Sequence, residues 1–271
     1  MERSIVLTNF FTRDKISAFS IHLAISLVIF LIILYFILVH WYPHPLFKTD
    51  GGWQGIRLIA SVDIVLGPLL TLIVFRKNKP HLKLDMSIIA TIQFCALASG
   101  IWIVYGEHPV LITYDEDRLR PIPAYQVLEA GISLDSIDKY GPNIPPIAFV
   151  DLPNESWARA ELFRKSRLES RPIYLNGNLY RTIDKNNIDR IRAHAIDLPK
   201  YVANRPKDRE IYEQFAKENA DELQNYIFLE LDSRFKWFIA VFNVKTYRLV
   251  DTIDILPPSL TQKEINIRIT D

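Results

Sequence analysis

The residue with the clearest chemical potential is Asp63, which lies inside an otherwise apolar segment, residues 56–75. A segment of this length can cross a lipid bilayer. An ionised carboxylate near its centre would cost roughly 2.5–3.5 kcal/mol of insertion free energy. The surrounding Leu, Ile, Val and Phe side chains can offset this cost, at about 0.3–0.6 kcal/mol each. Because the acid does not favour insertion, we expect it to have another role.

Three roles are open for Asp63. It can pin neighbouring helices together as a protonated or hydrogen-bonded acid, or offer a polar contact to another membrane helix. The third role is proton transport, which one acid without a relay serves poorly. Counted from Ile56 at the outer end, the acid lies roughly 10 Å deep, level with Tyr35 and Ser99. These two residues are therefore the expected helix–helix partners.

Gly67 and Pro68 follow the acid by four and five residues. Proline lacks a backbone N–H and clashes with the preceding turn, so the pair is expected to kink the helix and free carbonyls near Asp63. We interpret Asp63, Gly67 and Pro68 as one intramembrane polar and kinked site.

Other reactive residue patterns are weak. His40, His44 and His108 could gather at the outer end of the helices and hold a metal, but Pro43 prevents a helix from aligning the first two. Solvated histidines are the simpler interpretation. The chain has no glycine-rich phosphate loop, nucleophile elbow or His-Glu-x-x-His motif. We therefore expect no enzyme activity, cofactor or metal.

The elements that would position Asp63 are three apolar stretches, predicted as membrane helices over residues 19–42, 56–75 and 86–106. The first is too long for the apolar part of a signal peptide and is interpreted as an uncleaved anchor. Aromatic residues near one end of the helices agree with an outer interface. Basic residues mark the opposite, cytoplasmic end under the positive-inside rule: Arg13, Lys15, Arg76, Lys77, Lys79 and Lys83.

Residues 107–271 are predicted to form an exported α+β domain, with residues 1–106 as the three-helix transmembrane region. The domain carries 23 Lys and Arg against 26 Asp and Glu, a net charge of about −3, which argues against nucleic-acid binding. The single cysteine, Cys95, lies outside it. Runs of strands separated from runs of helices favour an α+β fold. The patterns also predict a hairpin turn at Asn176-Gly177 and a helix N-cap at Asn154.

The sequence resembles type IV pilin accessory proteins of the TfpX/TfpZ family. The similarity is strong over roughly the first 120 residues and general afterwards. The family often has a glycine at the position of Ser61 and an arginine at that of His108. The resemblance rests on these segments: residues 61–75, Trp41 to Leu46, Leu82 to Asp85, Ile92-Gln93, Pro109-Val110 and Asp117-Arg118.

This resemblance implies a multi-pass protein of the Gram-negative inner membrane that assists assembly or surface display of a cognate pilin. The implied partners are the lipid bilayer and a major type IV pilin, contacted through its membrane helix and its periplasmic head. A homo-oligomer is left open. The alternative from another class is an envelope sensor with a periplasmic ligand-binding domain, although the short cytoplasmic segments hold no signalling domain.

Overall fold

A computed structural model describes residues 12–260 of the chain, which divide into two compact units. The helical unit comprises residues up to Trp41 together with Gly52–Gly106. The second unit, here called the sheet domain, comprises Tyr42–Gly51 together with the chain from Glu107 onward. The segment Tyr42–Gly51 was expected to belong with the helices. The structure assigns it to the sheet domain instead.

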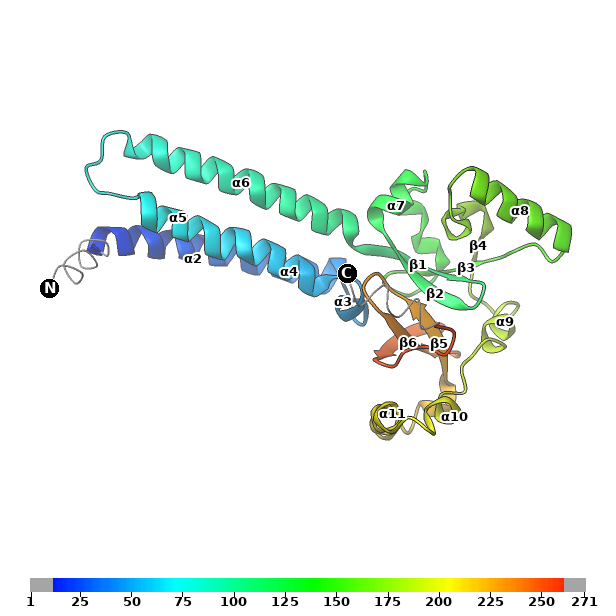
Figure 1. Cartoon of the computed structure of the whole chain (residues 1–271). Coiled ribbons are helices and arrows are strands. Elements are labelled where there is room, and N and C mark those ends of the chain that lie inside the picture. The colour runs from blue at the N-terminus through cyan, green and yellow to red at the C-terminus, as the bar shows by residue number, and fades with distance from the viewer. Residues whose placement is uncertain (1–11, 261–271) are drawn as a thin grey trace. The chain divides into compact units, whose positions relative to one another are not determined.

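The helical unit contains three continuous helical segments, labelled in Figure 1. They span 29, 23 and 26 residues and are long and apolar enough to cross a membrane. Each begins four to six residues before its predicted start. The first two segments each contain a π-helical stretch. The first segment consists of α2 (Arg13–Phe36) and η1 (Ile37–Trp41, π), and the second of α4 (Gly52–Ala60), η2 (Ser61–Leu66, π) and α5 (Gly67–Val74). The third is α6 (Leu82–Glu107).

Most apolar side chains of these helices are exposed in the chain, which is the pattern of helices that lie in lipid or against other helices. The few buried positions on α6 are Ile89, Gly100 and Val104. Val104 packs on Gly55 and Leu58 on Gly100, so α6 contacts the second segment at glycine positions. Small residues at helix interfaces allow this close approach.

The sheet domain is built on one seven-stranded mixed sheet with the strand order β4-β3-β1-β2-β5-β6-β7. Neighbouring strands are antiparallel except for the pairs β1–β3 and β2–β5, which are parallel. The strands are β1 (Pro109–Asp115), β2 (Arg118–Pro123), β3 (Ile147–Val150), β4 (Tyr180–Thr182), β5 (Tyr226–Asp232), β6 (Trp237–Asn243) and β7 (Arg248–Ile253).

Helices and short turns cover both faces of the sheet. One face buries Ile112, Leu119 and Leu229 beneath α9, and also buries Leu46 of α3. The other face packs against α7 in one half and against α10 and α11 in the other. The helices are α3 (Leu46–Thr49), α7 (Ala124–Glu129), α8 (Ser156–Leu168), α9 (Ile188–Arg192), α10 (Leu198–Val202) and α11 (Pro206–Glu218), with 3₁₀ turns η3 (Leu134–Ser136), η4 (Asp138–Tyr140), η5 (Ile173–Leu175), η6 (Gly177–Leu179) and η7 (Leu223–Asn225).

Two local predictions were wrong. Asn176-Gly177 does not form a hairpin turn, because the Asn176 side chain accepts from the Asn178 N–H and starts the 3₁₀ turn η6. Asn154 is not the N-cap of α8, since the helix begins at Ser156 with Glu155 at the cap position and no side-chain cap bond. Both errors are local and leave the α+β architecture intact.

Candidate functional site

Asp63 lies at the meeting point of the three helical segments and joins a polar cluster. Its carboxylate oxygen Oδ1 accepts from the Ser26 hydroxyl of α2 at 3.1 Å and from the Gln93 amide of α6 at 2.8 Å. Gln93 Nε2 also lies 3.3 Å from Ser26 Oγ. Only 1% of the Asp63 surface is exposed. The cluster therefore links all three segments through one enclosed carboxyl group.

The partners of Asp63 differ from those expected. Tyr35 is 56% exposed, and the Ser99 hydroxyl donates to the Cys95 carbonyl of its own helix. The depth count failed in part because the second segment begins at Gly52 rather than Ile56, which adds about 6 Å of helix. Asp63 consequently lies near the midpoint of its segment, as Ser26 and Gln93 do in theirs. Both are uncharged polar residues within apolar stretches, and that signal could have identified them.

Gly67 and Pro68 shape the helix beside the acid. The six residues before Gly67 form the π-helical segment η2, and Pro68 begins the following α-helix as one of its first residues. A π segment accommodates a proline that cannot donate to the preceding turn. The Asp63 carbonyl lies 3.4 Å from Gln93 Nε2. The expected irregularity is thus present as a widened helix that contacts α6.

The space above Gly67 is filled by Gln93. A Cβ atom at position 67 would overlap the carboxamide of Gln93, both its nitrogen and its oxygen. Glycine is therefore needed here for the Gln93 side chain to reach Asp63. The carboxamide of Gln93 therefore packs directly against the backbone of Gly67.

Two buried oxygens of the cluster lack a hydrogen-bond partner within residues 12–260: Asp63 Oδ2 and Gln93 Oε1. Both are acceptors when the carboxyl group is ionised. A buried acceptor without a donor is costly in an apolar surrounding. The chemistry available to the site is thus hydrogen bonding between helices, with two acceptor oxygens left without donors among the described residues.

A second polar contact joins the first two helical segments. His22 Nδ1 of α2 lies 2.6 Å from Thr71 Oγ1 of α5. Ser26 lies one helical turn from His22, so the same face of α2 carries both contacts. Neither His22 nor Thr71 was predicted as a site residue.

The basic residues predicted to set orientation lie at one end of the helical unit. Lys77 is 3.4 Å from Asp14, and Lys79 is 2.5 Å from Asp85. Lys15 is buried. The remaining three, Arg13, Arg76 and Lys83, are exposed.

The segment Tyr42–Gly51 is built into the sheet domain. Leu46 is 1% exposed and belongs to the main core cluster of the sheet. The Asp50 carboxylate accepts from Thr49 Oγ1 at 2.5 Å and from the backbone N–H of Arg234 at 3.3 Å. Burial raises the pKa of Asp50 to about 7. The connection between the first two helical segments and the chain after the third therefore form one folded body.

The histidines do not assemble a metal site. His44 lies 3.4 Å from Asp251, and His108 is buried. Within residues 12–260 no group of three or more His, Cys, Asp or Glu side chains is placed to hold a metal ion.

Comparison with known proteins identifies relatives in one bacterium. No family model and no solved structure matches the chain. The fimbrial assembly proteins of serogroups I and E1 of Dichelobacter nodosus are each 34% identical over 122 residues, which cover 44% of this chain and 46% of the relative. The chain thus matches about half the length of these two proteins.

A third relative is covered almost completely. The fimbrial assembly protein of serogroups C1 and C2 of Dichelobacter nodosus is 33% identical over 122 residues, which are 44% of this chain and 91% of that protein. Together with the three apolar helices, this similarity shows that the chain belongs to the family of fimbrial assembly proteins.

Proposed function

We propose that this protein is a non-enzymatic accessory protein of type IV pilus assembly, of the TfpX/TfpZ kind, which assists assembly or surface display of a major pilin. The observation that carries the proposal is the similarity to proteins named for fimbrial assembly. A unit of three apolar helices next to a folded domain suits a partner that has both a membrane helix and a globular head.

The proposed location is the inner membrane, with the N-terminus and residues 76–81 in the cytoplasm and the sheet domain in the periplasm. The basic residues near both of these segments support this orientation under the positive-inside rule. The inclusion of Tyr42–Gly51 in the sheet domain agrees with it. If all three helical segments cross the membrane, Tyr42–Gly51 and the chain after Glu107 lie on the same side of it.

The proposed pilin contact on the helical unit uses its exposed apolar surface and not the Asp63 carboxylate. Asp63 is enclosed by Ser26 and Gln93, so a partner helix cannot reach it without opening the bundle. Ala98, Ser99 and Trp102 of α6 are exposed and offer one such surface. The Asp63 cluster then acts indirectly, by holding the three helices in one arrangement.

The test is the ratio of surface pilin to total pilin in a strain deleted for this gene and in the complemented strain. The surface fraction should fall while pilin transcript and synthesis stay unchanged. A surface fraction equal to that of the parent would refute the proposal.

One observation favours the alternative of an envelope sensor: the sheet domain contains a cleft of about 490 Å³, within the usual range for a ligand site. A sensor would change the pilin transcript when the gene is deleted. The transcript measurement therefore separates the two functions.

A further inference from the structure

The cleft lies where two parallel strands of the sheet domain end. Strands β1 and β3 run parallel, with Tyr114 opposite Phe149. Both residues line the cleft, as do the chain segments that leave the carboxyl ends of these strands. Ligands of open mixed sheets commonly bind in a crevice outside the carboxyl ends of parallel strands. The position alone makes this cleft a candidate binding site.

The floor of the cleft holds a hydroxyl group without a partner. Tyr114 is 2% exposed, and its Oη has no hydrogen-bond partner within residues 12–260. Its ring stacks on Phe149, with centroids 5.9 Å apart and an interplanar angle of 14°. Burial raises the pKa of Tyr114, so the hydroxyl keeps its proton and can donate. A buried donor left unpaired is costly, and a ligand acceptor would remove that cost.

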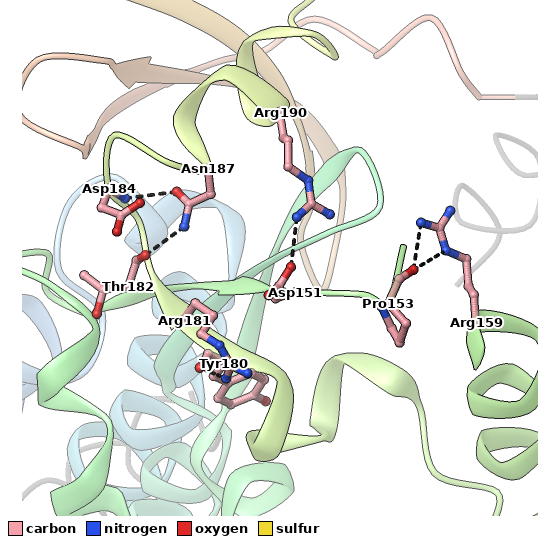
Figure 2. A network of polar contacts seen from close by, with 9 residues as sticks. All are labelled: Asp151, Pro153, Arg159, Tyr180, Arg181, Thr182, Asp184, Asn187 and Arg190. Carbon is pink, nitrogen blue, oxygen red and sulfur yellow. Dashed lines mark hydrogen bonds and ion pairs between the residues drawn. The ribbon is translucent and has the colours of Figure 1, made fainter. Parts of the chain in front are cut away.

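One wall of the cleft is cationic. Arg190 of α9 lies 4.7 Å above the Phe149 ring and donates to Asp151 at 2.8 Å, which fixes its guanidinium (Figure 2). Arg159 of α8 donates to the Pro153 carbonyl at 3.1 Å and 3.2 Å (Figure 2). His194 Nδ1 lies 2.9 Å from the Arg190 carbonyl. Each guanidinium has N–H groups that these bonds do not use. The planar fork of a guanidinium group suits a carboxylate.

The cationic wall is held in place by a local network. Asn187, which precedes α9, donates to the Thr182 carbonyl at 2.9 Å and accepts from the Asp184 N–H at 2.9 Å (Figure 2). These bonds tie the start of α9 to the end of β4. Arg190 is therefore presented from an anchored helix, with His194 in the turn that follows it, and a ligand does not need to order Arg190.

The cleft lining also contains two acidic side chains. Glu116 and Asp117 lie in the turn between β1 and β2, and Asp117 is paired with Arg118 at 3.1 Å. Carboxylates accept hydrogen bonds from N–H groups. A ligand that pairs with both kinds of lining residue thus carries a carboxylate for the arginines and N–H donors for Glu116 and Asp117. A peptide with an acidic side chain has both, whereas a simple dicarboxylate lacks the N–H donors.

We propose that this cleft binds an acidic peptide segment, with the ligand carboxylate between Arg159, Arg190 and the Tyr114 hydroxyl, and with peptide N–H groups on the side of Glu116 and Asp117. The inference goes beyond the proposed function. It can fail while a role in pilus assembly stands, because binding is measured on the isolated chain.

The test is calorimetric titration of the full chain in detergent micelles with three probes: acetyl-Ala-Glu-Ala-amide, its Gln counterpart and glutarate. The Glu peptide should bind saturably and at least about tenfold more tightly than the Gln peptide. The neutral Gln side chain cannot form the charge-assisted hydrogen bonds that the Glu carboxylate makes with the arginines. Absence of saturable binding, or equal binding of both peptides, overturns the site. If glutarate binds as tightly as the Glu peptide, the ligand does not need peptide N–H groups, and the assignment to a peptide is overturned.

Two variants locate the binding. Tyr114→Phe keeps the ring stacking and removes only the hydroxyl, so it should weaken Glu-peptide binding about five- to tenfold. Arg190→Gln should weaken it at least tenfold, whereas Arg192→Gln should not. Arg192 is on the same helix but pairs with Asp189 outside the cleft. Unchanged binding by Tyr114→Phe and Arg190→Gln would overturn the proposal.

Discussion

The Gln93 amide donates to Oδ1 of Asp63 at 2.8 Å, and this bond connects α6 to the π-helical segment of the second helical segment. The other oxygens of the two side chains, Asp63 Oδ2 and Gln93 Oε1, are buried without donors among the described residues. Ser26 of α2 donates to the same Oδ1 at 3.1 Å. The arrangement therefore makes the Asp63 carboxyl group a hydrogen-bonded link between the three helical segments.

The first prediction concerns Asp63→Asn. The asparagine amide keeps an acceptor for Ser26 and Gln93 and adds a permanent N–H donor, so the variant should accumulate and unfold in detergent like the parent. Interhelical hydrogen bonds in membranes contribute on average about 0.6 and at most about 1.7 kcal/mol each. Asp63→Leu, which removes the side-chain acceptor that Ser26 and Gln93 share, should lower stability by about 1–2 kcal/mol.

Pilus display by the two variants separates the roles of the acid. Under the pinning role, Asp63→Asn supports display and Asp63→Leu reduces it. Normal accumulation of Asp63→Asn together with lost display would contradict this role and favour a contact between the ionised acid and a partner.

The second prediction concerns Gly67→Ala. The added Cβ overlaps the Gln93 carboxamide and should displace it from Asp63. Overpacking of this kind costs about 1–3 kcal/mol. Gln93→Ala in the same chain should recover part of the loss, because it removes the clashing atoms. The measurement is thermal unfolding of the two single variants and the double variant.

Gly100→Ala is the matched control for this cycle. Among residues 12–260, its Cβ would come within 4 Å of Leu58 alone, at an ordinary contact distance of 3.9 Å. If Gly67→Ala were as stable as Gly100→Ala, the close packing of Gln93 over Gly67 would be refuted.

Local patterns in the sequence predicted the elements well, because hydrophobic length and alternation are local properties. The three apolar helices and the α+β class of the domain after them were found in this way. The partners of Asp63 were not, since residues on different helices are level only if every helix start is known. The four-residue error in the start of the second segment accounts for four of the six positions that separate Ser99 from Gln93.

Long-range features were missed for a similar reason. Strand β2 contains Pro121 and Pro123, which cannot donate to a neighbouring strand and argue against a central strand. The structure accommodates them because β2 pairs with β5 only at Arg118 and Leu119. The burial of Leu46 in the sheet core joins residues more than sixty positions apart. No local pattern carries that information.

The third prediction tests this burial of Leu46. Leu46→Ala should destabilise the sheet domain by about 2–5 kcal/mol, because a fully buried leucine is replaced by a cavity. The same substitution at Leu168, which is 71% exposed, should change stability little. Thermal unfolding of the full chain measures both. Equal effects of the two variants would show that the segment Tyr42–Gly51 does not contribute to the core.

The fourth prediction is a dependence of stability on pH that originates at Asp50. Burial raises its pKa from 3.8 to about 7 in the folded chain. Between these values the folded state keeps a proton that the unfolded state has released. The stability that Asp50 contributes is therefore fully present below about pH 3.8 and is lost as the pH rises through about 7. Burial raises the pKa of Asp115 to about 6, and this group acts in the same direction.

The melting temperature of the sheet domain should therefore be higher at about pH 5.5 than at about pH 8. A linkage of about 1 kcal/mol would move it by about 2–4 °C in a domain of this size. Asp50→Asn should reduce this difference without removing it, because Asp115 still titrates. The asparagine oxygen can still accept from the Arg234 N–H. The Asp50→Asn variant lacks only the titration at position 50. If its melting temperature differed between the two pH values as much as that of the parent, Asp50 would be excluded as the source of the pH dependence.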